Sequence, residues 1–122
     1  MGKKVLVIDD DVEMGMLIEM VLEADGYDVH LANSGSEGLE MASEVHPDLV
    51  ILDIMMPDMD GFAVCSSLRE MLNVPVLMLT AHSSEKQMLR SFTTGADDFL
   101  GKPFGNAELR ARVRALLRRS EY

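Results

Sequence analysis

The sequence predicts an α/β protein of a single domain, in which a parallel five-stranded sheet carries helices on both faces. Five short apolar runs alternate with five amphipathic stretches along the 122 residues. The first, third and fourth runs are apolar without interruption, which is typical of strands that helices cover on both faces. Parallel strands of this kind are joined by right-handed crossovers, so the pattern indicates five βα units.

The predicted strands are short, and the fifth is the shortest of them. They lie at residues 5–8, 27–31, 49–52, 76–79 and 99–100. Between and after the strands, apolar residues recur with the spacing of one helix face. The residues of the five faces are Met14, Leu17, Ile18 and Val21; Leu39, Ala42 and Val45; Val64, Cys65, Leu68 and Leu72; Met88, Leu89 and Phe92; and Leu109, Val113, Leu116 and Leu117.

Local signals mark where the helices begin and end. Ser34 and Ser84 are each followed three residues later by Glu or Gln, which is the pattern of a capping box at a helix N-terminus. The predicted helix ends are a glycine or a residue shortly before a proline. These ends are Gly26, His46, Asn73 and Gly95. The chain shows no repeat or linker that would divide it into two domains.

Composition and charge exclude several classes of function. The net charge is -10 at pH 7, and the acid excess lies before residue 105, since five arginines oppose two glutamates after it. Phosphate contacts need clustered lysine and arginine, so we expect no direct binding of nucleic acid by this domain. The apolar runs are far too short to span a bilayer, so we expect no membrane association. A single cysteine excludes an internal disulfide and is natural in a reducing cytosol, so we expect a cytoplasmic protein.

Polar side chains follow four of the predicted strands. Asp9 and Asp10 follow the first strand, Asp53 the third, Thr80 the fourth and Lys102 the fifth. Function gathers at the carboxyl ends of parallel strands, and neighbouring first and third strands would crowd the three aspartates together. Two carboxylates about 4 Å apart repel each other by roughly 4 kcal/mol at an effective dielectric constant of about 20. Such crowding requires a cation, a proton or a lysine nearby.

Magnesium suits this predicted cluster, because it binds carboxylates, carbonyl oxygens and water. Lys102 would bring a fixed positive charge to the same edge, and the Thr80 hydroxyl and nearby backbone N–H groups could donate to an anion. Together these groups predict phosphoryl transfer to an aspartate oxygen without a P-loop.

Structural explanations exist for some of the acids. Asp10 or Asp11 could cap the first helix. Asp58 and Asp60 are expected to be turn and N-cap residues around the third helix. Asp53 has no such explanation, because four loop residues separate it from the nearest plausible cap.

Four segments carry a resemblance to a known family. "VLVIDDD", "ILDIMMPDMDG", "LMLTAHS" and "GADDFLGKPF" resemble, in order and spacing, the receiver domain of two-component response regulators. The resemblance extends from residue 4 to about residue 119. It implies a flavodoxin-like, doubly wound (βα)5 three-layer sandwich with strand order 2-1-3-4-5, and a single receiver domain over residues 1–122. It also implies a signalling switch rather than an enzyme, with self-phosphorylation and autodephosphorylation as its only chemistry.

The resemblance implies roles for the residues at the strand ends. Asp53 would be the phosphoacceptor, which receives a phosphoryl group from the phosphohistidine of a sensor histidine kinase. Lys102 would pair with that phosphoryl group, and the Thr80 hydroxyl and the Ala81 backbone N–H would donate hydrogen bonds to it. The Lys102–Pro103 peptide bond would be cis.

The resemblance further implies a metal site and a switch. Asp9, Asp10, Asp53 and the Met55 backbone carbonyl would hold Mg²⁺. Phosphorylation would draw Thr80 toward the site, and the aromatic ring of Phe99 would turn into the space vacated. Phe99 has no hydroxyl, so we predict a switch based on packing alone.

The C-terminal segment resembles that of receivers attached to winged-helix DNA-binding domains of the OmpR type. In that class, phosphorylation promotes a symmetric dimer through the fourth helix, fifth strand and fifth helix. The matching interface residues here are Asp97, Asp98, Glu108, Arg112 and Arg119. The chain would then be the N-terminal part of a longer regulator with an output domain. It could instead be a single-domain regulator or a phosphorelay intermediate.

Two other classes share features of the sequence. A metal-dependent aspartyl phosphatase shares the chemistry, but the chain has no Asp-x-Asp motif followed by threonine and no cap insertion for a substrate. A flavin-binding electron carrier shares the topology, but it needs a Ser/Thr/Gly-rich phosphate loop after the first strand. The acids found there would repel a phosphate.

Overall fold

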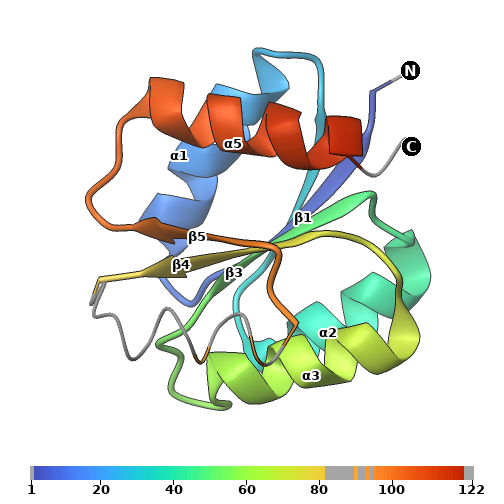
Figure 1. Ribbon diagram of the computed structural model, residues 1–122. Helices are drawn as coiled ribbons and strands as arrows, with labels where there is room; N and C mark the ends of the chain where they lie inside the picture. The colour runs from blue at the N-terminus through green and yellow to red at the C-terminus, as the bar shows by residue number, and fades with distance from the viewer. Residues whose placement is uncertain (1, 82–89, 91–92, 94, 120–122) are drawn as a thin grey trace.

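The fold is a five-stranded parallel sheet between two layers of helices (Figure 1). The structure, a computed structural model, describes residues 2–81, 90, 93 and 95–119. The strand order is β2-β1-β3-β4-β5, which confirms the order that the resemblance implied. The strands are β1 (Lys4–Ile8), β2 (Asp28–Ala32), β3 (Leu49–Asp53), β4 (Val76–Thr80) and β5 (Asp98–Gly101).

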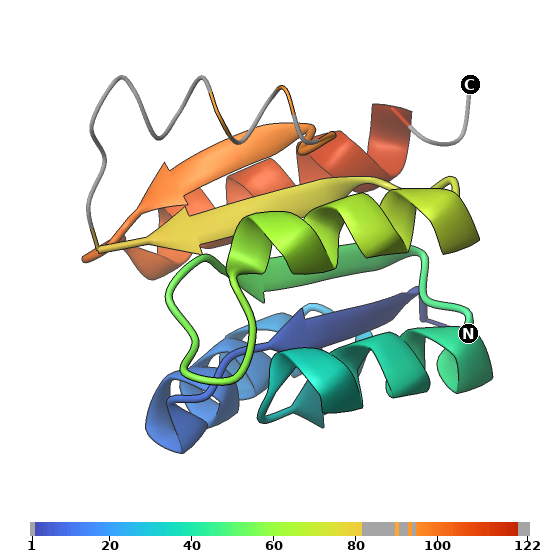
Figure 2. The same cartoon turned by 90° about the horizontal axis from the view of Figure 1, so that it is seen from below.

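Helices cover the sheet in pairs. Within the described residues they are α1 (Val12–Glu23), α2 (Gly35–Val45), α3 (Gly61–Met71) and α5 (Asn106–Arg119). The pair α1 and α5 covers one face, and α2 and α3 cover the other, as Figure 2 shows from the side of α2 and α3. Most of the fourth predicted helix, including its Ser84 cap and its apolar face, lies outside the described residues. No helix of the part that is described has both the length and the apolar character needed to span a bilayer.

Two apolar clusters fill the spaces between the layers. Val5 and Val7 of β1 join the cluster beneath α1 and α5, whereas Leu6 and Ile8 join the cluster beneath α2 and α3. Side chains of a strand alternate between its faces, so an uninterrupted apolar strand supplies both clusters. Every residue of β3 and β4 is buried, as the continuous apolar runs predicted.

The predicted strand positions are accurate to about one residue. The second strand begins at Asp28 rather than at residue 27. The reason is that the Tyr27 N–H donates to the Leu22 carbonyl, 3.3 Å away, and so closes the turn after α1. The face predicted for the first helix is partly wrong, because Leu17 is 40% exposed. Its buried stripe is Gly15, Ile18 and Leu22.

Side chains cap α1, α2 and α3 at residues that the sequence offered. Of the two candidates for α1, Asp11 is the cap, since its carboxylate accepts from the N–H groups of Glu13 and Met14. Ser34 caps α2, with Oγ 3.1 Å from the Glu37 nitrogen. The Glu37 carboxylate accepts from Asn33, not from Ser34 as in a standard capping box. The predicted stops Gly26 and Gly95 have positive φ angles of 91° and 105°.

The loop from β3 to α3 is fixed by contacts at both ends. Asp60 caps α3 by accepting from Phe62 N–H at 2.9 Å. Asp58 accepts from the N–H groups of Gly35 and Ser36, and these bonds lower its pKa. Asp58 has a structural role, as expected, but its carboxylate caps α2 rather than the loop in which Asp58 itself lies. Gly61 N–H donates to the Ile54 carbonyl, and a Cβ on Gly61 would lie only 2.5 Å from the Ile54 Cα.

Candidate functional site

The register of the sheet brings the predicted strand-end residues to one edge. Ile8 of β1 pairs with Leu52 of β3, so the next residues of the two strands, Asp9 and Asp53, lie side by side. In the same way, Asp53 of β3 pairs with Leu79 of β4, and Thr80 is the next residue of β4. Thr80 pairs with Gly101 of β5. Lys102 follows Gly101 directly. The parallel topology alone therefore assembles residues that are far apart in the chain.

Three carboxylates and one ammonium group form the centre of the site. Ligand oxygens of Asp9, Asp10 and Asp53 all lie within 4.8 Å of one another. Lys102 Nζ lies 3.3 Å from an Asp9 oxygen and 3.4 Å from an Asp53 oxygen. Asp9 and Asp53 are only 2% and 5% exposed, whereas Asp10 is open to solvent. One lysine cannot balance three carboxylates, so the site retains an excess of negative charge.

Burial controls the ionisation of Asp9. It raises the pKa of this carboxyl from 3.8 to about 6, although the Asp11 N–H, which donates to it at 2.9 Å, acts in the opposite direction. The neighbouring Asp53 charge raises the same pKa further, and Lys102 lowers it. Asp9 therefore loses its proton near pH 6 rather than near pH 4.

Lys102 remains a cation in this setting. Burial by itself lowers the pKa of its ammonium group, but the charges of Asp53 and Asp9 outweigh that effect and raise it. Its backbone N–H donates to the Thr80 carbonyl at 2.6 Å, which ties the end of β5 to the end of β4. The Lys102–Pro103 peptide bond is cis, as the resemblance implied.

The donor set fits a hard divalent cation. The clustered oxygens of Asp9, Asp10 and Asp53 are the ligand type that Mg²⁺ prefers, and exposed Asp10 leaves room for water ligands. Met55 follows Asp53 closely, and its N–H donates to an Asp53 oxygen at 3.2 Å. Its side chain is 56% exposed beside the site.

The two predicted switch residues lie on neighbouring strands, β4 and the edge strand β5. Thr80 is fully buried at the end of β4, and Ala81 after it is exposed. Phe99 of β5 is 7% exposed and belongs to the apolar cluster beneath α2 and α3. In this structure the aromatic ring therefore already lies inside the protein.

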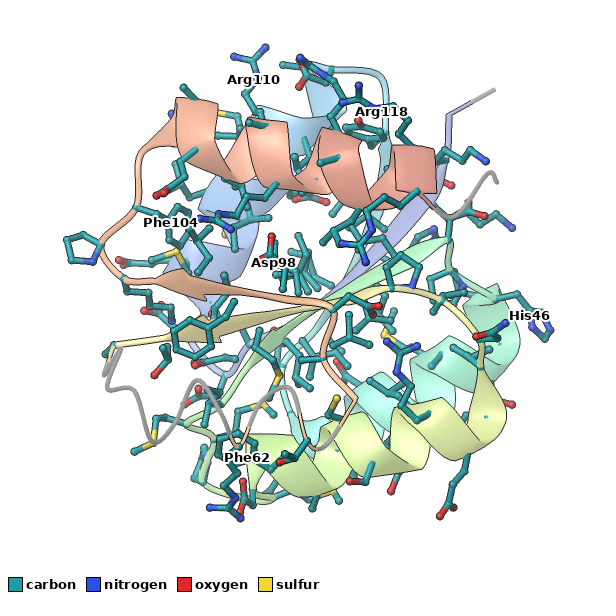
Figure 3. All side chains as sticks on the ribbon, viewed as in Figure 1. His46, Phe62, Asp98, Phe104, Arg110 and Arg118 are labelled. Atoms are coloured by element: carbon teal, nitrogen blue, oxygen red, sulfur yellow. The ribbon has the colours of Figure 1, made fainter. Side chains whose placement is uncertain are left out.

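Several residues predicted for a dimer interface make contacts within the chain. The Asp97 carboxylate contacts the Arg69 guanidinium and accepts from the Val76 N–H at 2.8 Å. Asp98, the first residue of β5, lies on the side of the strand that faces α5 (Figure 3). There, Arg112 Nη1 is 2.9 Å from both of its carboxylate oxygens. Glu108 lies 3.7 Å from Arg112 on the same helix. Arg119 is exposed on α5 and forms no ion pair with any residue that the structure describes.

Sequence reasoning did not find Arg69. Its nitrogens contact the carbonyls of Gly95 and Val74 as well as Asp97, and its Nε lies 2.7 Å from the Gly95 oxygen. An isolated arginine on a helix gives no local signal of a partner 28 residues away.

The comparisons with known proteins agree with this geometry. A family model described as the response regulator receiver domain matches residues 5–114. The chain belongs to this family. The receiver domain is 47% identical over 122 residues to the alkaline phosphatase synthesis transcriptional regulatory protein PhoP of Bacillus subtilis (strain 168), covering 99% of this chain and 51% of PhoP. It is 46% identical over 121 residues to the DNA-binding dual master transcriptional regulator RpaA of Synechocystis, covering 97% of this chain and 50% of RpaA.

Solved structures have the same fold as this receiver domain. A two-component response regulator from Clostridium difficile superposes with a TM-score of 0.95 at 30% identity, covering 98% of this chain and 99% of that one. The receiver domain of the Francisella response regulator 1452 gives 0.92 at 36% identity, with 98% and 99% coverage. This receiver domain is thus a phosphoacceptor signalling domain of a two-component system. The chain spans about half the length of the curated relatives it matches.

Proposed function

We propose that Asp53 is the phosphoacceptor of this receiver domain, and that a sensor histidine kinase is its phosphoryl donor. The observation that supports this most strongly is the position of Asp53 at the end of the central strand. Asp9 and Asp10 follow the neighbour on one side, β1, and Thr80 ends the neighbour on the other side, β4. A phosphoryl group on Asp53 would therefore meet the acidic pair on one side and the hydroxyl on the other.

The chain's own groups account for the transfer. An ionised Asp53 oxygen attacks the phosphorus of the donor phosphohistidine, a P–O bond forms, and the P–N bond to the imidazole breaks. Lys102, 3.4 Å from an Asp53 oxygen, offsets the charge on the phosphoryl group, and Thr80 and the Ala81 N–H donate hydrogen bonds to it. Asp9, Asp10, Asp53 and the Met55 carbonyl would hold Mg²⁺, which when bound neutralises charge on the transferred oxygens.

The surface beside the site suits a helical donor. Val12, Met16 and Met20 lie on one side of α1 and are 51%, 54% and 66% exposed. This apolar ridge begins next to the acidic pair, and three glutamates flank it, namely Glu13, Glu19 and Glu23. We infer that a donor helix with apolar and basic side chains docks along this ridge while its phosphohistidine reaches Asp53.

The output of the domain is a change in the surface around β5 and α5. Phosphorylation draws Thr80 toward the phosphoryl group and favours one packing of Phe99, because the group stabilises one of two pre-existing states. A homodimer through Asp97, Asp98, Glu108, Arg112 and Arg119 would then form. Relatives of twice this length are named transcriptional regulators, which supports an output domain that acts on transcription.

Incubation with Mg²⁺ and acetyl phosphate, followed by intact mass measurement, tests the proposal. The parent should gain one labile phosphoryl group, and Asp53→Asn should gain none. Asp58→Asn is the matched control, because Asp58 lies in the same loop but caps α2. Phosphorylation of Asp53→Asn at the parental rate would disprove the assignment. Size-exclusion chromatography of the same samples tests dimerisation.

A further inference from the structure

The strand that carries Lys102 has few backbone contacts of its own. The strand β5 has four residues and lies at the edge of the sheet. In the described part of the chain it pairs with β4 alone. Phe99 lies within it and Lys102 directly follows it. Groups that fix the position of β5 therefore also fix the position of the Lys102 ammonium.

One such group is Arg69 of α3, which contacts the turn that enters β5. Its Nε donates to the Gly95 carbonyl at 2.7 Å, and its other nitrogens contact the Val74 carbonyl and Asp97. A Cβ on Gly95 would lie 2.7 Å from the Arg69 Cγ, so the turn closes directly on the arginine.

Asp97 extends this contact into the sheet. Its carboxylate accepts from the Val76 N–H at 2.8 Å, and its own N–H donates to the Val76 carbonyl at 2.8 Å. Arg69 and Asp97 are 25% and 29% exposed, so their ion pair is partly shielded from water. A planar guanidinium that satisfies three acceptors at once holds the start of β5 against both α3 and β4.

A second arginine, Arg112, contacts β5 from its opposite face. Arg112 of α5 contacts Asp98, the residue after Asp97, through Nη1. The Arg112 Nε is buried and has no hydrogen-bond partner among the described residues, and a buried N–H without a partner costs stability. Arg69 contacts two backbone carbonyls as well as Asp97, whereas among the described residues Arg112 contacts only the carboxylates of Asp98 and Glu108.

We propose that Arg69 is a positioning residue for phosphoryl transfer, which acts through Asp97 and β5 to hold Lys102 beside Asp53. The proposal rests on the proposed function of Asp53. Rigid secondary elements can couple distant positions, and β5 is a short strand that Lys102 follows, five residues beyond Asp97. Arg69 is far from the reacting atoms and contacts none of the three aspartates of the site among the described residues.

The test compares Arg69→Gln with Arg110→Gln. Arg110 also lies in an Arg–Asp pair, with Asp25, but it is on the side of α5 away from Asp98 (Figure 3). Phosphorylation by acetyl phosphate at saturating Mg²⁺ and Mg²⁺ affinity by calorimetry are measured for both. We expect Arg69→Gln to slow phosphorylation about tenfold, because small displacements of a positioned group are costly to rate. Its Mg²⁺ affinity should be unchanged, and Arg110→Gln should change neither quantity.

An unchanged rate in Arg69→Gln overturns the proposal, and so does a parallel loss of Mg²⁺ affinity, which would indicate general loosening of the site. If Arg69→Gln does not fold, Arg69→Lys serves instead, since lysine keeps the charge but cannot bind three acceptors together. Hydrogen exchange of the β5 amides should accelerate in the Arg69 variant and not in Arg110→Gln. This readout needs no phosphorylation, so it separates failure of the anchor from failure of the proposed function.

Discussion

The aspartates at the two ends of β5 differ in how their charges are balanced. At its start, Asp97 pairs with Arg69 and Asp98 pairs with Arg112. Beyond its other end, Lys102 contacts Asp9 and Asp53 and is the cation beside a cluster of three aspartates. Paired carboxylates hold elements in place, whereas a cluster with too few cations has capacity left for a metal ion and a phosphoryl group. Around β5, the number of cations per carboxylate therefore distinguishes the aspartates that fix the strand from those that could hold a metal ion.

Among the changes that test this difference, removal of the Lys102 ammonium group should have the largest effect, and the effect should be on the phosphorylation rate. In Lys102→Met no ammonium group faces the transferred phosphoryl group and only bound Mg²⁺ would offset its charge, so phosphorylation by acetyl phosphate should slow about 100-fold. Mg²⁺ affinity should not fall, because the loss of a positive charge strengthens the attraction of the carboxylates for a cation. Rates and calorimetry together check this prediction. A normal rate with weakened Mg²⁺ binding would show that Lys102 serves the metal site instead.

Removal of a paired aspartate should lower stability without weakening Mg²⁺ binding. Asp97→Ala leaves the Val76 N–H and the Arg69 guanidinium without their carboxylate. The free energy of unfolding should fall by about 1–3 kcal/mol, and Mg²⁺ affinity should stay at the parental value. Urea unfolding followed by circular dichroism measures the first quantity. A stable variant that has lost Mg²⁺ binding would erase the distinction between the two ends of β5.

The neighbouring residues Asp10 and Asp11 should differ in the same way, the first affecting Mg²⁺ binding and the second affecting stability. Asp10→Asn removes an exposed carboxylate of the cluster and should weaken Mg²⁺ binding about tenfold with little change in stability. Asp11→Ala removes the cap of α1 and should cost about 1 kcal/mol of stability while Mg²⁺ binding is retained. The same two assays apply to both variants. Exchanged phenotypes would mean that Asp11 binds the metal and Asp10 is only a cap.

The smallest expected effect is the change in folding stability with pH that the titration of Asp9 causes. Its pKa is raised from 3.8 to about 6, so the folded protein holds this proton more tightly than the unfolded chain does. Asp9 therefore contributes stability that is present below about pH 4 and is lost as pH rises through about 6. Measured without Mg²⁺, the stability of the parent relative to Asp9→Asn should fall across this window. A relative stability that rises with pH would mean that the pKa is lowered instead.

The sequence predicts the parts of this protein that local rules determine. Uninterrupted apolar runs predict the positions of β3 and β4, and the parallel topology then brings Asp53, Thr80 and Lys102 to one edge. Helix caps at Ser34 and Asp60 are also local, because each contacts backbone only two or three residues away.

Contacts between distant residues could not be predicted in this way. Asp58 reaches a helix 22 or 23 residues earlier in the chain, and Arg69 reaches Asp97 28 residues later. Periodicity carries no signal of such pairs. The exposure of Leu17 has a related cause, since the sheet beneath α1 buries only a narrow stripe of the helix.

We propose that Asp53 alone, among three clustered aspartates, accepts the phosphoryl group. Borohydride reduces an aspartyl phosphate to homoserine, so it marks the acceptor before the phosphoryl group is lost. The protein is treated with acetyl phosphate and Mg²⁺, reduced, digested and sequenced by mass spectrometry. We predict homoserine at position 53 alone, and homoserine at position 9 or 10 would show that another aspartate is the acceptor.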